Sequence, residues 1–290
     1  MNFNRIIAVV ILITFSGCQD YGKMNKKSSL SRDLAEISGI AVFRGNPTIY
    51  AIADHSNPNK VYALNYNGEI LQEILIANAK NEDWEDLTTD GEKRLFIGDF
   101  GNNDNIRTDQ TIYTINDIQS VSQPVDTAMA VMKTTFTLDD QKNFPAKLDN
   151  RNFDIEAFIY KDDFFYFFTH NRNRKDFDGL TKVYRVPAKD GNYKATPLAQ
   201  YKLCDDSINC AITSAVLSQD GKTLLLLTYD AIYKVTDFEN NDFFSGKIDK
   251  VPFDDESKKE ALTFKDSITL FIADERRAQS GGNLYEFSLD

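Results

Sequence analysis

The chain has 290 residues, of which 42% are hydrophobic and 27% charged, with only three cysteines. This composition excludes an intrinsically disordered chain, a collagen and a disulfide-rich miniprotein. The 44 acidic residues outnumber the 33 basic ones, and a formal charge of -11 repels phosphate backbones, so we expect no nucleic-acid partner.

Residues 1–17 have the three-part pattern of a secretory signal. Arg5 is an early positive charge, residues 6–15 form an almost unbroken apolar run, and two small residues complete the segment. An apolar run of this length covers only about half of a ~30 Å hydrocarbon core, so a permanent membrane-spanning helix is not expected. We therefore predict that residues 1–17 are removed after export.

The residues around Cys18 resemble the lipobox of bacterial lipoproteins. Phe15-Ser16-Gly17-Cys18 places small residues before the cysteine, with Phe15 in place of the usual aliphatic residue. The resemblance implies cleavage before Cys18 and its lipidation; the alternative is an ordinary signal with an incidental cysteine. Several acyl chains on one residue anchor firmly, because each buried CH₂ contributes ~0.8 kcal/mol. We expect a lipid-anchored protein of the bacterial cell envelope, at the outer membrane and facing the periplasm or the exterior, with residues 18–33 as a tether.

Beyond the tether, the chain repeats one strand pattern. Each repeat opens with a small or acidic residue and an apolar run, continues through a turn into a second β-rich run, and reaches a third after a loop. The openings begin at residues 38, 85, 156, 214 and 260. Fourth strands are predicted over 69–76, 131–138, 194–202 and 246–253, with residues 26–34 as the source of the last one.

Four-stranded repeats of ~40 to 50 residues are typical of β-propeller blades. We therefore predict an all-β protein with a single β-propeller domain over residues 34–290, built from four-stranded antiparallel blades. The five openings indicate five blades, and six blades are the alternative, because one degenerate blade could be merged with a neighbour. We expect a monomer.

Two cysteines flank a short polar segment at Cys204 and Cys210. A compartment outside the cytoplasm permits them to pair, so we predict a local disulfide, with two partly buried free thiols as the alternative. The spacing does not fit a zinc site, which needs four ligands.

Polar residues recur at two positions of each repeat, the start of the first strand and the end of the second. In a propeller blade both positions lie at the same mouth of the central channel, so their side chains should converge there. The predicted ligand-binding residues are Asp54, Glu85, Asp99, Arg107, Glu156, His170, Arg172, Glu260, Asp274 and Arg276.

Clustered carboxylates repel one another, and burial raises their pKa unless a cation compensates. Ca²⁺ or another divalent cation is one candidate, because it prefers oxygen ligands. The candidate metal ligands are Glu85, Asp99, Glu156 and Glu260. Arginines that pair with the carboxylates are the second candidate, and the remaining interpretation is that the acidic residues only form turns.

Several segments resemble bacterial envelope propellers of the SdiA-regulated and esterase-like-phytase type, whose blades begin with Glu-Gly or Glu-Ala before an apolar strand. They are Ser38-Gly39-Ile40-Ala41, Asp83-Trp84-Glu85-Asp86, Ile97-Gly98-Asp99-Phe100-Gly101-Asn102-Asn103, Glu156-Ala157 and Glu260-Ala261. The resemblance covers residues 34–290 and implies the fold without an activity. β-Propeller phytases carry a denser acidic calcium platform that this chain does not match position by position.

We predict a binding or scaffold propeller whose acidic mouth receives a small polar ligand or a protein loop. The alternative is a divalent-metal-dependent hydrolase that acts on a phosphoester or a lactone-like substrate at the same mouth. No catalytic residue is assigned, but His170 and His55 are the candidates for proton transfer, since imidazole titrates near neutral pH.

Overall fold

The computed structural model describes residues 23–121, 125–173, 175, 177–278 and 280–289. The predicted signal and the lipidation site at Cys18 lie outside these residues. Within them, no helix has the length and apolar character needed to cross a membrane.

The described residues form 21 strands and three short 3₁₀ helices. The helices are η1 (Arg32–Leu34), η2 (Ile118–Ser120) and η3 (Phe243–Ser245). The strands are β1 (Asn25–Ser29), β2 (Ile37–Val42), β3 (Ile49–Ala53), β4 (Lys60–Leu64), β5 (Ile70–Ile76), β6 (Trp84–Thr89), β7 (Arg94–Asp99), β8 (Gln110–Asn116), β9 (Val125–Ala128), β10 (Met132–Leu138), β11 (Asp154–Lys161), β12 (Phe164–His170), β13 (Leu180–Pro187), β14 (Gly191–Lys202), β15 (Ser214–Leu217), β16 (Leu224–Leu227), β17 (Ala231–Thr236), β18 (Lys247–Pro252), β19 (Lys259–Phe264), β20 (Thr269–Asp274) and β21 (Asn283–Ser288).

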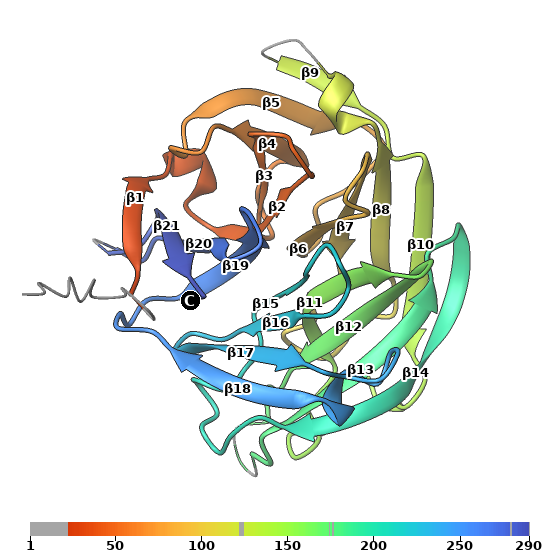
Figure 1. The fold of residues 1–290 in the computed structure, drawn as a ribbon. Coiled ribbons are helices and arrows are strands. Elements are labelled where there is room, and N and C mark those ends of the chain that lie inside the picture. Colours follow the sequence, from red (N-terminus) through yellow and green to blue (C-terminus); the bar gives the residue numbers. More distant parts are fainter. Residues whose placement is uncertain (1–22, 122–124, 174, 176, 279, 290) are drawn as a thin grey trace, which may run out of the picture.

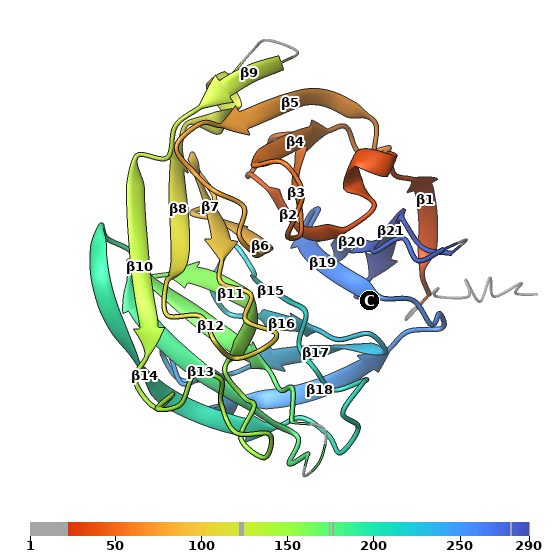
Figure 2. The same ribbon diagram turned by 180° about the vertical axis from the view of Figure 1, so that it is seen from behind.

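The strands form several four-stranded antiparallel sets arranged around a central axis (Figure 1, and from behind in Figure 2). In strand order these sets are β2-β3-β4-β5, β6-β7-β8-β10, β11-β12-β13-β14, β15-β16-β17-β18 and β19-β20-β21-β1. Two parallel contacts extend them, since β9 pairs with β5, and β10 pairs with β14. The innermost strands β2, β6, β11, β15 and β19 contact one another in turn, and β19 contacts β2. This is a β-propeller-like, all-β fold.

The first described strand closes the ring. β1 pairs with β21, so strands from the two ends of the described chain share one sheet. The predicted tether over residues 18–33 is therefore too long, because Asn25–Ser29 belongs to the folded domain. β1 is a polar edge strand with two lysines, a composition that discourages pairing with further strands.

The hydrophobic core consists of apolar layers between neighbouring strand sets. The layer between the β6 and β11 sets is rich in phenylalanine; Phe136 stacks on Phe167, with ring centroids 4.4 Å apart. β12 is buried along most of its length, because both of its faces pack against neighbouring sets. These layers hold the inner strands in place and so fix the ends of those strands at the mouth.

Four innermost strands contain a β-bulge near their first residue. The pairing register shifts at Ser38 in β2, Glu85 in β6, Glu156 in β11 and Glu260 in β19. A bulge leaves one residue outside the regular ladder and re-aims its side chain. The bulged positions are the openings of the sequence repeat, so the repeat places these side chains at equivalent points of the ring.

Asp86 lies inside the ring and joins three innermost strands. Its Oδ1 accepts hydrogen bonds from the Leu87 amide at 2.9 Å and the Ser214 hydroxyl at 3.1 Å. Its Oδ2 accepts from the Phe158 amide at 3.2 Å and the Ala215 amide at 3.4 Å. Burial raises the pKa of Asp86 well above its usual range, and these donors oppose that rise.

We predict that Asp86→Ala lowers the free energy of unfolding by about 3 kcal/mol or more. The substitution leaves buried backbone amides of β11 and β15 without an acceptor, and each such group costs ~1–3 kcal/mol. Urea denaturation of the variant and the wild type measures the difference. Glu92→Ala is the control, because Glu92 is exposed, and it should stay within about 0.5 kcal/mol. Equal stability of Asp86→Ala and wild type would contradict the role of Asp86.

Candidate functional site

A cavity of about 550 Å³ opens at the mouth of the ring, beside the bulged strand ends. This volume is typical of small-molecule sites. The lining is mostly polar and consists of Glu36, Ile37, Ser38, Asp54, His55, Glu85, Asn103, Glu156, His170, Arg172, Ser207, Ile208, Tyr229, Lys258, Glu260, Glu275 and Arg277.

The cavity brings together most of the predicted ligand-binding residues. Those that line it are Asp54, Glu85, Glu156, His170, Arg172 and Glu260, and the candidate proton carrier His55 lines it as well. Those that do not line it are Asp99, Arg107, Asp274 and Arg276. Each of these four contacts structural partners instead of the cavity.

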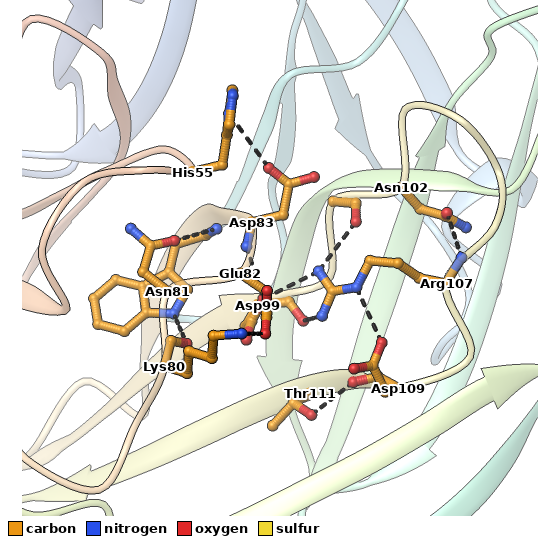
Figure 3. A network of polar contacts seen from close by, with 12 residues as sticks. His55, Lys80, Asn81, Glu82, Asp83, Asp99, Asn102, Arg107, Asp109 and Thr111 are labelled. Carbon is orange, nitrogen blue, oxygen red and sulfur yellow. Dashed lines mark hydrogen bonds and ion pairs between the residues drawn. The ribbon is translucent and has the colours of Figure 1, made fainter.

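Asp99 and Arg107 pair with each other behind the mouth (Figure 3). Arg107 Nη1 lies 3.1 Å from Asp99 Oδ1 and also donates to the Gly101 carbonyl at 3.1 Å. Asp99 Oδ1 accepts the amide of Asp83 at 3.0 Å. Burial raises the pKa of Asp99, and Arg107 opposes that rise. The pair therefore shapes the loop after β7 instead of facing the cavity.

Asp274 and Arg276 stabilise the last loop in the same way. Asp274 accepts hydrogen bonds from the Asn283 amide at 2.7 Å and the Tyr285 hydroxyl at 2.8 Å. Arg276 Nη2 donates to the Leu30 carbonyl at 2.9 Å. These contacts connect the ends of the described chain, so both residues are structural and lie outside the cavity lining.

A group of polar, titratable side chains lies on the wall formed by β11 and β12. His170 Nδ1 is 2.6 Å from Glu156 Oε2 and 3.1 Å from the Ile212 carbonyl. Arg172 Nε is 2.6 Å from Asp154 Oδ2, and its Nη2 pairs with Glu156 Oε1. Burial alone would raise the pKa of Glu156, but the charges of His170 and Arg172 overcome it and lower that pKa to about 2.

A second charged group contains Lys258, which the sequence analysis did not select. Lys258 pairs with both Glu260 and Glu275, and the Tyr229 hydroxyl lies 3.4 Å from Glu260 Oε1. The adjacent Lys259 instead points inward, where its Nζ donates to the Asp255 carbonyl at 2.9 Å. The sequence Lys-Lys-Glu does not tell which lysine faces the mouth, and no motif signals the difference.

Burial raises the pKa of Glu260 to about 8, despite the nearby ammonium of Lys258. Burial, followed by the charge of Asp54, likewise raises the pKa of Asp83 to about 8. The pKa of Glu85 is raised well above its usual range, first by burial and then by the charges of Asp54 and Glu156. The mouth thus holds more carboxyl groups than its cations neutralise.

Glu85 differs from the other glutamates of the mouth. It lines the cavity and is only 8% exposed. Among the residues that the structure describes, it has neither a hydrogen-bond partner nor an ion pair. A buried carboxyl group without a partner is energetically costly. Glu85 is therefore the group in the cavity that a bound partner would stabilise most.

The four predicted metal ligands do not form one cation site. Asp99 is held by Arg107, Glu156 by Arg172 and His170, and Glu260 by Lys258. A cation that bound them would have to displace these pairs. Of the four, Glu85 alone is unpaired in the described part of the chain.

No family model matches the chain, and no curated protein sequence matches it. Among solved structures, the PQQ-bound aldose sugar dehydrogenase from Streptomyces coelicolor has a TM-score of 0.51 and 8% identity, covering 90% of this chain and 95% of its own. The hydrazine synthase of Kuenenia stuttgartiensis has a TM-score of 0.41 and 10% identity, covering 82% of this chain and 61% of its own. The similarity to the dehydrogenase shows the fold alone, an all-β fold of the β-propeller kind.

We predict that the free energy of unfolding falls as pH rises from about 4.5 to about 8 through ionisation of Glu260. In this range the folded protein keeps a proton on Glu260 that the unfolded chain has released, so rising pH favours unfolding. Glu260→Gln should reduce the fall in the free energy of unfolding across this pH range by ~3 kcal/mol. Urea denaturation across this pH range measures the slope. Glu73→Gln, in a surface pair with Lys60, should keep the wild-type slope; a Glu260→Gln profile identical to wild type would contradict the prediction.

Proposed function

We propose that this protein binds a small polar ligand in the mouth cavity. The observation that carries the proposal is Glu85, a buried carboxyl group without a partner that faces a cavity of ligand size. A ligand that offers a cation or hydroxyl donors would satisfy Glu85 and relieve the repulsion among its acidic neighbours. A protein loop with a basic side chain would have the same chemistry.

The rest of the cavity wall supports a ligand with several polar groups. Arg172 and Lys258 are fixed by ion pairs with glutamates, which holds their positions before a ligand arrives. Fixed donors and acceptors on a rigid scaffold reduce the entropy lost on binding. Ile37 and Ile208 are the apolar exceptions in the lining, so a strongly apolar ligand is disfavoured.

A second candidate function is hydrolysis of a phosphoester or a lactone-like substrate. The contact between His170 Nδ1 and Glu156 favours it, because a carboxylate on one ring nitrogen orients imidazole and leaves Nε2 as a proton acceptor. In this function His170 would activate a water molecule, and Arg172 would hold Glu156 in place. Turnover of a phosphoester or a lactone would distinguish hydrolysis from ligand binding alone.

We also propose that the protein is a lipoprotein of the bacterial cell envelope, anchored through Cys18. The proposal is supported by the signal pattern of residues 1–17 and by the lipobox resemblance. The folded domain begins at β1 on the outside of the ring, so an anchor on Cys18 would leave the mouth free.

We infer in addition that the ring has five blades and not six. The inference is supported by the innermost strands β2, β6, β11, β15 and β19, which contact one another in sequence and close on β2. β9 extends the first set at its outer edge instead of starting another blade.

A thermal-shift panel tests ligand binding with spermidine, choline, glucosamine and glucose as probes. At least one probe should raise the melting temperature of the wild type by about 2–4 °C at a concentration far above its Kd. Glu85→Gln should abolish the shift, because it removes the charge that the ligand satisfies. Glu92→Gln, on an exposed site, is the matched control.

The proposal fails if no probe shifts the wild type, or if Glu85→Gln responds like the wild type. Turnover of phosphoesters or lactones by the wild type, lost in Glu156→Gln, would instead support the hydrolase.

We predict that Cys18→Ala releases the protein from the membrane fraction after signal cleavage. The lipid on Cys18 is the proposed anchor, so the variant should lose its attachment to the membrane. Membrane fractionation followed by blotting measures the distribution. Cys204→Ala leaves Cys18 intact and should stay membrane-bound, which separates loss of the lipid from loss of a cysteine elsewhere. Retention of Cys18→Ala in the membrane would rule out the anchor.

A further inference from the structure

Four carboxylates at the mouth lack a lysine or arginine partner, and one of them, Glu36, accepts a hydrogen bond from the Asn57 side chain instead. Asp54 follows β3, while Asp83 and Glu85 flank the buried Trp84 at the start of β6. The other acidic groups around the cavity are neutralised or hydrogen-bonded, as described for Glu156, Glu260 and Glu275. Asp54, Asp83 and Glu85 therefore lack the positive charge of a lysine or arginine, and we call these three residues the unpaired trio.

A histidine lies next to two members of the trio. His55 Nδ1 is 3.2 Å from Asp54 Oδ1. It is 3.7 Å from Asp83 Oδ1, a contact drawn in Figure 3. One ligand atom from each of these three residues lies within 4.8 Å of the other two. Asp83 Oδ1 is buried and accepts no hydrogen bond within the described residues. The spacing and the free lone pairs suit a shared cation.

Gly101 shows that Glu85 lies beside Asp83, although Glu85 is not one of the three residues whose ligand atoms all lie within 4.8 Å. A Cβ added to Gly101 would lie 2.1 Å from Glu85 Oε1 and 2.3 Å from Asp83 Oδ2. Both oxygens therefore converge on one small region of space, which is open only because residue 101 has no side chain. The backbone of Gly101 is itself held by the loop, since its amide donates to the Asp83 carbonyl at 3.2 Å.

Arg107 on the neighbouring loop does not form an ion pair with any member of the unpaired trio. Arg107 pairs with Asp99 and with Asp109, each at 3.1 Å, and its charge only opposes the rise that burial causes in the pKa of Asp83. Glu85 itself is nine-tenths buried, without a partner, and lines the cavity. Three acidic groups held together in this way need a cation from outside the chain.

We propose that Asp54, His55 and Asp83 bind one divalent transition-metal ion of the Mn²⁺ or Zn²⁺ kind, with the acidic group of Glu85 beside Asp83 strengthening the attraction. Carboxylate oxygens alone would suit Mg²⁺ or Ca²⁺, but an imidazole ligand favours a transition metal. The proposal deepens the proposed ligand site and rests on it for its setting. An ion held there faces the cavity, so the polar ligand would bind it through an oxygen atom.

The test is calorimetric titration of the full-length protein, extracted in detergent and stripped with EDTA, with MnCl₂, ZnCl₂ and CaCl₂. The wild type should bind one Mn²⁺ or Zn²⁺ more tightly than Ca²⁺. Asp83→Asn and Glu85→Gln should each weaken this binding at least about ten-fold, because the first removes a ligand and the second removes the acidic group beside it. Circular dichroism checks that each variant is folded.

Three further variants separate a built site from general acidic attraction. Asp109→Asn removes an exposed charge on the neighbouring loop and should leave the affinity unchanged. Glu92→Gln is the corresponding control for Glu85→Gln. Gly101→Ala keeps every charge but places a methyl group against Glu85 and Asp83, and it should weaken metal binding about as much as Asp83→Asn.

Stoichiometric binding that Asp83→Asn, Glu85→Gln and Gly101→Ala all retain would overturn the site, as would the absence of binding. Tighter binding of Ca²⁺ than of Mn²⁺ or Zn²⁺ would overturn the histidine ligand. The same EDTA-stripped protein is also tested with the thermal-shift probes. A probe that still stabilises the stripped wild type, but not Glu85→Gln, would leave the ligand site standing while the metal proposal fails.

Discussion

The ring depends on the buried carboxylate of Asp86. Each innermost strand pairs with a neighbour on one edge only, and its other edge turns amide groups toward the axis. Asp86 accepts the amides of Phe158 and Ala215, so one side chain from β6 satisfies the free edges of β11 and β15. On its other side Gly39 of β2 lies against the Asp86 and Leu87 backbone, where a Cβ would come within 2.6 Å of the Leu87 amide nitrogen. Four innermost strands are thus held around one point.

The same close approach produces the chemistry of the mouth. Bulges at equivalent places aim acidic side chains from several strands into one small volume, where burial and mutual repulsion would destabilise them. Two cations, Arg172 and Lys258, offset part of this repulsion, because each forms ion pairs with two carboxylates. Glu85 and its neighbours receive no such cation. The proposed binding function rests on this imbalance, because a ligand that pairs with Glu85 would stabilise a carboxyl group that the fold leaves without a partner.

The repeat pattern predicted those site residues that open successive repeats. Glu85, Glu156 and Glu260 open their repeats, and the cavity collects all three. The pattern failed for Asp99 and Asp274, which also occupy equivalent positions at strand ends. Asp99 pairs with Arg107 from the loop after β7. Asp274 instead accepts hydrogen bonds from Asn283 and Tyr285 of β21. These partners differ between repeats, so the strand periodicity does not predict them. Lys258 was missed for the same reason, because its neighbour Lys259 is chemically identical and only the fold separates their directions.

The sequence by itself determined the strand succession and the acidic character of the mouth, since these depend on local residue types and their spacing. Export and lipidation stay predictions from the sequence. The tertiary structure decided which charges are neutralised. Pairing requires atoms within a few ångströms, and the partners are brought together from distant parts of the chain, as with Asp86 and Ser214, which are 128 residues apart. The formal charge of -11 therefore indicated an acidic protein, but only the folded ring distinguishes the paired glutamates from the unpaired trio.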